Sequence, residues 1–339
     1  MLRRVPPDAE RPSRTPQGEA LAVWAIWGLV LLAIVVTYSR LPPEETYNVS
    51  REGIVGGLSR VVVELNFPIA LVAIGITLVA LSALPAAAWW AGGPAIALCA
   101  VTAWPGVVDQ SDLDARWVNA VPAAGVAIAV GLTAVAARRS GRRFTPRRGL
   151  DRVRIVLAAV TLVISIPWIA AILGFYLPEG IFIMERPGLE NGVAIAAVHL
   201  GQHHGFMGAL IVASALLLSR SRLPAGRLDA VTRLYVSLAF AYGAVNMTQD
   251  AWNEQLWKRG TVDWKELQMT WTLEEPTRFA QLLAGDMAHG LFRFQTLQRG
   301  EGRFGSLGEG RQRQNDQSGG ECCFLVHGHF PQCLCLKIR

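Results

Sequence analysis

The sequence predicts an all-α fold, a polytopic transmembrane helical bundle of about seven spans with a cytoplasmic N-terminus. Apolar residues make up 52% of the 339 residues and charged residues only 17%, whereas about one quarter of the residues in a soluble domain are charged. The apolar residues gather in seven runs of 18 to 26 residues, the length that a helix needs to cross a hydrocarbon core of about 30 Å. Arginines also concentrate in alternate loops, as cytoplasmic loops require.

The spans follow one another with short connections. Residues 1–20 are a basic leader, and no small-residue cleavage site follows the first span, so we expect that span to be retained in the mature protein. The loop at 39–66 is predicted to contain a short interfacial helix at 58–66. The seven-span domain covers 21–251. Its spans are predicted at 21–38, 67–84, 86–107, 118–137, 153–177, 193–218 and 234–251.

The charges in the loops set the predicted orientation. The loop at 138–154 has eight arginines and one acid, and that at 220–233 has four arginines and one acid. The alternate loops at 109–116 and 178–192 each have three acids and one base. Because basic loops stay in the cytoplasm, we place the N-terminus on the cytoplasmic side of a bacterial-type plasma membrane. The net charge of +6 is then accounted for by these loops, so we expect the lipid bilayer, and no nucleic acid, as a partner.

Two segments follow the last predicted span. Residues 252–290 contain four tryptophans among charged residues, which is typical of an extracytoplasmic interfacial segment or the start of an eighth helix. Residues 291–339 are rich in Arg, Gly and Gln, which predicts disorder. Their final cysteines and histidines leave three interpretations open: an unstructured tail, a zinc site, or a reading frame that shifts near residue 290.

Three of the six histidines lie in the stretch VHLGQHHG, residues 198–205. On a helix, His199 and His203 share a face and His204 points about 100° away. Counting from Arg220 at about 1.5 Å per residue places them within about one turn of the outer membrane boundary. Gly201 and Gly205 form a GxxxG pair, which predicts close packing against another helix.

The last span has a second polar line, because Tyr242, Asn246 and Asp250 are spaced by four residues. Asp250 and His203 are predicted at a similar depth, on helices that a short loop makes antiparallel neighbours. Ionisable groups inside a membrane are candidates for function. The sequence therefore predicts a ligand or proton site near the outer face, built from His199, His203, Asp250 and Asn246, with Tyr242 and His204 beside it.

The same histidines allow a different interpretation, because neutral imidazole binds Zn, Cu and Fe. The stretch HLGQHH is similar to one histidine box of the membrane fatty-acid desaturase and hydroxylase family. That family needs several boxes, and this chain has one, so we reject the resemblance. Two functional classes remain. The first is a transporter-like or sensor-like bundle without enzymatic chemistry that binds a small ligand or ion. The second is a metal- or haem-dependent membrane oxidoreductase that uses His199 and His203, with His204 as a further metal ligand.

Overall fold

The computed structural model describes a helical unit that contains every predicted span in part. All described residues belong to one compact unit, Met1–Gly285, and the second unit, Asp286–Arg339, lies outside them. The described residues end at 252, so the predicted interfacial segment beyond that residue and the predicted disordered tail lie outside them. The structure describes residues 15–42, 49–104, 106–109, 112–165, 189–190, 193–194 and 205–252.

Four helices among the described residues are long and apolar enough to cross a membrane, which confirms a membrane class of protein. The first is α1, Gly18–Tyr38. The second is a continuous helix, Gly53–Leu81, and the third runs from Ala86 to Ala103 and includes α4, Trp89–Ala100. The fourth is Trp117–Ser140, which consists mainly of α5, Ala120–Ser140. These bounds agree with the first, third and fourth predicted spans to within a few residues.

The second membrane-length helix begins at Gly53, much earlier than the span predicted at 67–84. Residues 58–66, expected as a separate interfacial helix, belong to α2, Gly53–Glu64, which continues through a π-helical segment, Leu65–Ile69, into α3, Ala70–Leu81. Pro68 lies inside the π-helical segment. A proline cannot donate to the helix and its ring clashes with the preceding turn, and the wider turn accommodates both defects. The charged residues of α2 pair with each other, so they do not end the helix.

Three further helices cover the later predicted spans in part. α6, Asp151–Ile164, begins the fifth; α8, Met207–Leu218, ends the sixth; and α9, Arg227–Asp250, contains nearly all of the seventh. None of the three meets both the length and the apolarity of a span within the described residues, so the described residues contain four candidate spans and the seven spans remain a prediction.

A short strand pair changes the start of the predicted sixth span, while the described residues are otherwise helical, which confirms the all-α class. Val193 and Ala194, placed at the start of the sixth span, form strand β2, which pairs antiparallel with β1, Leu189–Glu190. The two residues between the strands in the sequence are Asn-Gly, the dipeptide most typical of a tight hairpin turn. The apolar run from 193 to 218 is therefore not helical from its first residue.

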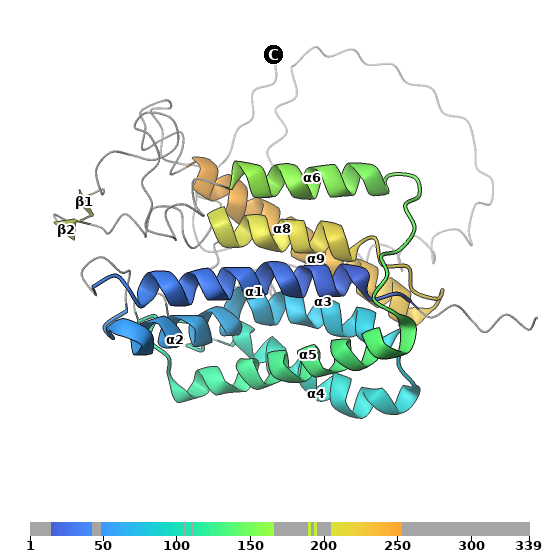
Figure 1. The fold of residues 1–339 in the computed structure, drawn as a ribbon, viewed down its shortest axis with the longest axis horizontal. Helices are drawn as coiled ribbons and strands as arrows, with labels where there is room; N and C mark the ends of the chain where they lie inside the picture. Colours follow the sequence, from blue (N-terminus) through green and yellow to red (C-terminus); the bar gives the residue numbers. More distant parts are fainter. Residues whose placement is uncertain are drawn as a thin grey trace, which may run out of the picture. The chain divides into compact units, whose positions relative to one another are not determined.

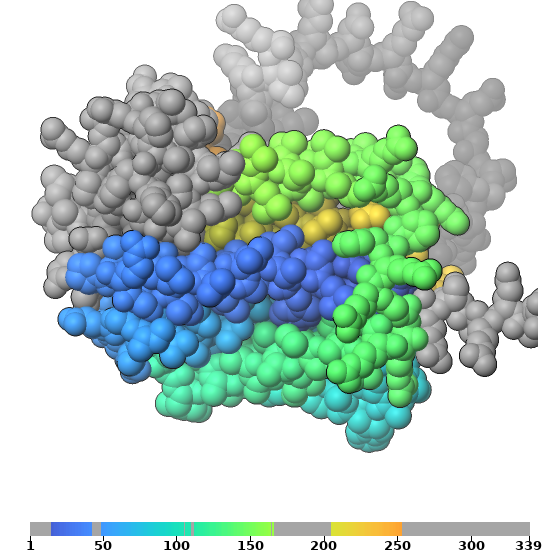
Figure 2. Space-filling view, in the orientation of Figure 1, coloured from blue at the N-terminus to red at the C-terminus, as the bar shows by residue number. Residues whose placement is uncertain are grey.

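The α2–α3 helix is the most buried of the four membrane-length helices, with 78% of its apolar window inside the unit, compared with 28% for α1 and 22% for the third. α3 contacts α4, α5, α8 and α9, and α6 packs against α8 near the edge of the unit (Figure 1). Leu29 on α1 and Val163 on α6 are 68% and 61% exposed. The surfaces of α1 and α6 face the viewer in Figure 2. Such surfaces suit contact with lipid chains.

Ion pairs join the helices at one end of the unit, which we call the arginine-rich end. It comprises the start of α1, the loop 141–150 and the loop 219–226. Glu19 is fully buried there and lies 3.3 Å from the guanidinium of Arg220, while the N–H of Thr145 donates to the Glu19 carboxylate at 3.0 Å. Arg220 in turn donates to the Thr145 carbonyl at 3.0 Å. This network holds α1, the loop before α6 and the end of α8 together.

Candidate functional site

A buried ion pair lies near the opposite end of the unit, on α2. The guanidinium of Arg60 is 3.2 Å from the carboxylate of Glu64, and the two side chains are only 3% and 2% exposed. Residues four apart lie on one face of a helix, so the pair forms within a single turn. The Arg60 guanidinium also lies over the ring of Tyr38, 5.9 Å from its centroid. Transferring a charged side chain from water into the protein costs roughly several kcal/mol per ion, even when two such ions attract each other. The burial of Arg60 and Glu64 therefore requires an explanation.

Two buried amide side chains beside the ion pair have a structural role, because they hydrogen-bond two helices together. Asn66 donates to the Asn119 carbonyl at 2.7 Å, and Asn119 donates to the Asn66 side-chain oxygen at 3.1 Å. The Asn119 oxygen accepts the N–H of Arg116 at 2.7 Å. Both side-chain oxygens thus have donors. These amides join the second helix to the start of the fourth, and nothing about them calls for a ligand.

Asp114 holds the adjoining loop against the start of α2. Its carboxylate accepts the N–H and the hydroxyl of Ser50 and the hydroxyl of Ser59, and Arg51 lies 3.8 Å away. Partial burial acts to raise the pKa of Asp114, but the hydrogen bonds from Ser50 and Ser59 and the charge of Arg51 outweigh it, so the pKa lies below its ordinary value. This carboxylate is a structural anchor at neutral pH.

The predicted polar line on α9 is buried in the same part of the unit. Tyr242, Asn246 and Asp250 are 4%, 0% and 5% exposed. The side chain of Asn246 donates to the Tyr242 carbonyl at 2.8 Å. The three residues thus share a buried face, as the spacing of four predicted. Glu254, the next residue in that line, lies outside the described residues.

Two contacts show that the α2–α3 helix and α9 run antiparallel. The rings of Phe67 and Tyr242 meet edge to face with their centroids 6.3 Å apart. One turn further along α3, the Tyr235 hydroxyl donates to the Leu71 carbonyl at 2.6 Å. Glu64 lies three residues before Phe67 and Asn246 four residues after Tyr242, which is about 4.5 Å and about 6 Å in the same axial direction. Glu64 and Asn246 are therefore at nearly the same level.

Buried acceptor oxygens at this level lack donors among the described residues. They are Glu64 Oε1, Asn246 Oδ1 and Gln249 Oε1. A buried polar atom without a hydrogen bond costs about 1–3 kcal/mol. Arg60 Nε, beside them, is a buried donor that also lacks a partner among the described residues. Acceptors still outnumber this donor by three to one, which favours an occupant that brings donors or positive charge. We call Glu64, Asn246 and Gln249 the acceptor cluster.

The close approach of α8 and α9 places Asn246. A Cβ added to Gly208 would lie 2.7 Å from the Gly243 carbonyl oxygen and 3.2 Å from the Cβ of Asn246. The prediction that the sixth and seventh spans are neighbours is confirmed by this contact. The glycines that the structure shows at the contact are Gly208 and Gly243. Of the predicted pair, Gly201 lies outside the described residues, and Gly205 begins the described part of the segment.

The predicted histidines cannot be compared with these contacts, because His199, His203 and His204 lie outside the described residues. Among the residues that the structure does describe, no group of His, Cys, Asp and Glu could hold a metal ion. Sequence reasoning missed Arg60 and Glu64 as site residues, because their charges assigned them to a loop. The signal that could have found them is their spacing of four within an otherwise apolar stretch.

No family model, curated protein or solved structure matches the chain. Its class therefore rests on its own features: four helices that could cross a membrane, and a buried ion pair within one of them.

Proposed function

We propose that the protein is a non-enzymatic multi-pass membrane protein, a transporter-like or sensor-like bundle. In this proposal it has seven spans and a cytoplasmic N-terminus in a bacterial-type plasma membrane. The polar site near the outer face binds a small ligand that carries hydrogen-bond donors or positive charge, or passes protons. The observation that supports it most is the acceptor cluster, which lies beside a buried ion pair in a helix of membrane-spanning length.

Three features favour a site over a purely structural role for these residues. Ionisable groups within spans are costly and usually functional. Both charges of the ion pair come from α2, and the contact of Arg60 with the Tyr38 ring of α1 leaves Glu64 Oε1 without a donor among the described residues. The π-helical segment Leu65–Ile69 directly follows Glu64, and such turns are frequent at functional sites.

The proposal also includes His203. It is five residues before Gly208 in the sequence, so chain length keeps its Cα within about 18 Å of the Gly208 contact with α9. A neutral imidazole there would supply a donor to the acceptor cluster, and its near-neutral titration would suit proton transfer. His199 and Asp250 complete the site in this proposal, with Tyr242 and His204 beside them.

Proton movement tests the proposal directly. The full-length protein is reconstituted in liposomes that contain a pH-sensitive dye, and a pH gradient is imposed. We expect flux above that of empty liposomes, reduced at least about tenfold in Glu64→Gln, which removes the group that can release a proton. Glu52→Gln is the matched control, because Glu52 is exposed at the start of the same helix and makes no side-chain cap.

A site that takes up a proton without moving it across the bilayer would still respond to pH. We therefore also measure the thermal unfolding midpoint between pH 5 and 8, where Glu64→Gln should change the profile and Glu52→Gln should not. The absence of both flux and a Glu64-dependent profile would overturn the proposal. Stoichiometric metal or a haem spectrum that His203→Ala abolishes would favour the oxidoreductase over this proposal.

The predicted orientation has its own test. A cysteine introduced by Ser140→Cys should react with an impermeant reagent only after cells are permeabilised.

A further inference from the structure

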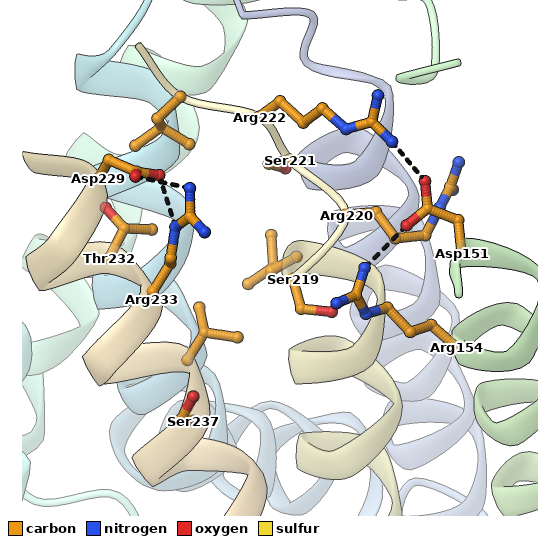
Figure 3. A pocket seen from close by; sticks show the side chains of 13 residues that line it. Asp151, Arg154, Ser219, Arg220, Ser221, Arg222, Asp229, Thr232, Arg233 and Ser237 are labelled. Carbon is orange, nitrogen blue, oxygen red and sulfur yellow. Dashed lines mark hydrogen bonds and ion pairs between the residues drawn. The ribbon is translucent and has the colours of Figure 1, made fainter. Parts of the chain in front are cut away.

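A polar pocket lies at the arginine-rich end, far from the acceptor cluster along the helices. Its volume is about 350 Å³, within the range of about 300–1,000 Å³ that small-molecule sites occupy. It is formed by the start of α6, the end of α8, the loop that follows, and the first turns of α9 (Figure 3). Its polar lining residues are Asp151, Arg154, Ser219, Arg220, Ser221, Arg222, Asp229, Thr232, Arg233 and Ser237.

Positive charge exceeds negative charge around this pocket. Four arginines and two aspartates line it. Asp151 is shared by two of the arginines, with Arg154 and Arg222 each 2.8 Å from its carboxylate oxygens. Arg233 pairs with Asp229 at 2.7 Å. Arg220 pairs with Glu19 behind the lining, so one positive charge remains without a carboxylate of its own.

The pocket also has donors that nothing in the described residues uses. The buried Nε of Arg220 and the buried hydroxyl of Ser221 have no hydrogen-bond partner there. Arg220 lines the pocket and is only 4% exposed. Arg154 and Arg222 are 39% and 38% exposed and can turn part of their guanidinium groups toward an occupant. Unused donors and excess positive charge call for an anion with several acceptor oxygens.

We propose that this pocket binds a phosphate group, either that of an anionic lipid headgroup or that of a soluble phosphate compound. Guanidinium groups bind phosphate through paired hydrogen bonds, which makes arginine the residue of choice for this anion. In the site, Arg220 Nε and the Ser221 hydroxyl donate to phosphate oxygens, and Arg222 balances the charge.

The two sources differ in what lies next to the pocket. α6 begins in the pocket wall at Asp151, and its following turns expose Val156, Val160 and Val163 by 58%, 48% and 61%. Lipid chains could lie along this apolar face while the headgroup enters the pocket. A soluble phosphate compound would make no use of this apolar face of α6.

The test measures binding to the full-length protein in an uncharged, phosphate-free detergent. The probes are inorganic phosphate, glycerol 3-phosphate, phosphatidylglycerol and, as a lipid without phosphate, diacylglycerol. Thermal stabilisation and titration calorimetry report binding. Stabilisation by phosphatidylglycerol alone identifies a headgroup site, and saturable binding of the two soluble probes identifies a site for soluble phosphate compounds.

Variants connect either result to the pocket. Ser221→Ala and Arg222→Gln should each weaken binding about tenfold or more, since a hydrogen bond to a charged group contributes about 1.5–3 kcal/mol and each 1.4 kcal/mol is about tenfold. Arg222→Gln leaves Arg154 on Asp151, so the local fold is kept. The control is Arg138→Gln, an exposed arginine near the same end that does not line the pocket. No binding of any probe, or equal losses in all three variants, would overturn the proposal.

Discussion

At the arginine-rich end, Glu19 and Arg220 come from distant parts of the chain, and both also hold Thr145 by hydrogen bonds. At the opposite end, Arg60 and Glu64 pair within one turn of one helix. The first pair therefore positions distant elements relative to each other, while the second contacts another helix only through the Arg60 guanidinium over the Tyr38 ring of α1. The balance of unused groups differs as well. Two donors, Arg220 Nε and the Ser221 hydroxyl, and one acceptor, Gln17 Oε1, lack partners at the arginine-rich end, whereas at the other end one donor, Arg60 Nε, lies beside the three acceptors of the acceptor cluster. Buried charge of similar depth thus joins distant parts of the chain at one end and lies within one helical turn at the other.

Replacing both members of each pair by apolar residues is the strongest way to break this comparison. A buried ion pair exchanged for apolar side chains is often neutral for stability, so Arg60→Met with Glu64→Leu should leave the free energy of unfolding nearly unchanged. Glu19→Leu with Arg220→Met should lower it by about 3–5 kcal/mol, because the N–H and hydroxyl of Thr145 lose their buried acceptor. Reversible unfolding in mixed micelles measures both. Equal losses in the two double variants would contradict the distinction.

Disrupting the contact between α8 and α9 that positions Asn246 should have a smaller effect on stability. Gly208→Ala would place a methyl group 2.7 Å from the Gly243 carbonyl oxygen, and overpacking of this kind costs about 1–3 kcal/mol. We expect Gly208→Ala to lower stability by that amount and also to reduce proton flux, since Asn246 lies in the acceptor cluster. Gly28→Ala is the control, because nothing lies within 4 Å of the added Cβ. Normal flux in a destabilised Gly208→Ala protein would separate Asn246 from the site.

Acid should weaken an anchoring carboxylate at each end, with the smallest effects of the three tests. Burial acts to raise the pKa of Asp151, but hydrogen bonds from the Arg148 N–H and from Arg154, with the charges of Arg222 and Arg220, lower it overall. Asp114 has a lowered pKa as well. A lowered folded-state pKa stabilises the protein above the unfolded value of about 3.9, and this contribution is lost as pH falls through the folded pKa.

Unfolding midpoints measured from pH 6 down to pH 3 should therefore fall less steeply in Asp151→Asn and in Asp114→Asn than in the unaltered protein. The larger change belongs to Asp151, which is 2% exposed and contacts two arginines, whereas Asp114 is 12% exposed. For Asp114 we expect about 1 kcal/mol or less. An acid profile that neither substitution alters would show that these carboxylates do not anchor their loops.

Much of the helical content could be predicted from local pattern alone. The first, third and fourth membrane-length helices follow uninterrupted apolar runs, and the spacing of Tyr242, Asn246 and Asp250 predicted their common buried face. The start of the second helix could not be predicted in this way. Arg60 and Glu64 look like loop residues when each charge is counted separately, and only their pairing makes them compatible with a buried helix. The strand pair at Val193–Ala194 was missed because a short apolar segment suits a strand and a buried helix equally well.

The sequence by itself determined which segments are apolar enough to enter a membrane and which side of α9 is polar, because both depend on local composition and on the period of the helix. The tertiary structure alone decided the partners: Glu19 with Arg220, Phe67 with Tyr242, and Gly208 with Gly243. The physical reason is that apolar helices in lipid gain little from burial as such. Their association depends on close packing and hydrogen bonds between specific surfaces, which a one-dimensional pattern does not contain.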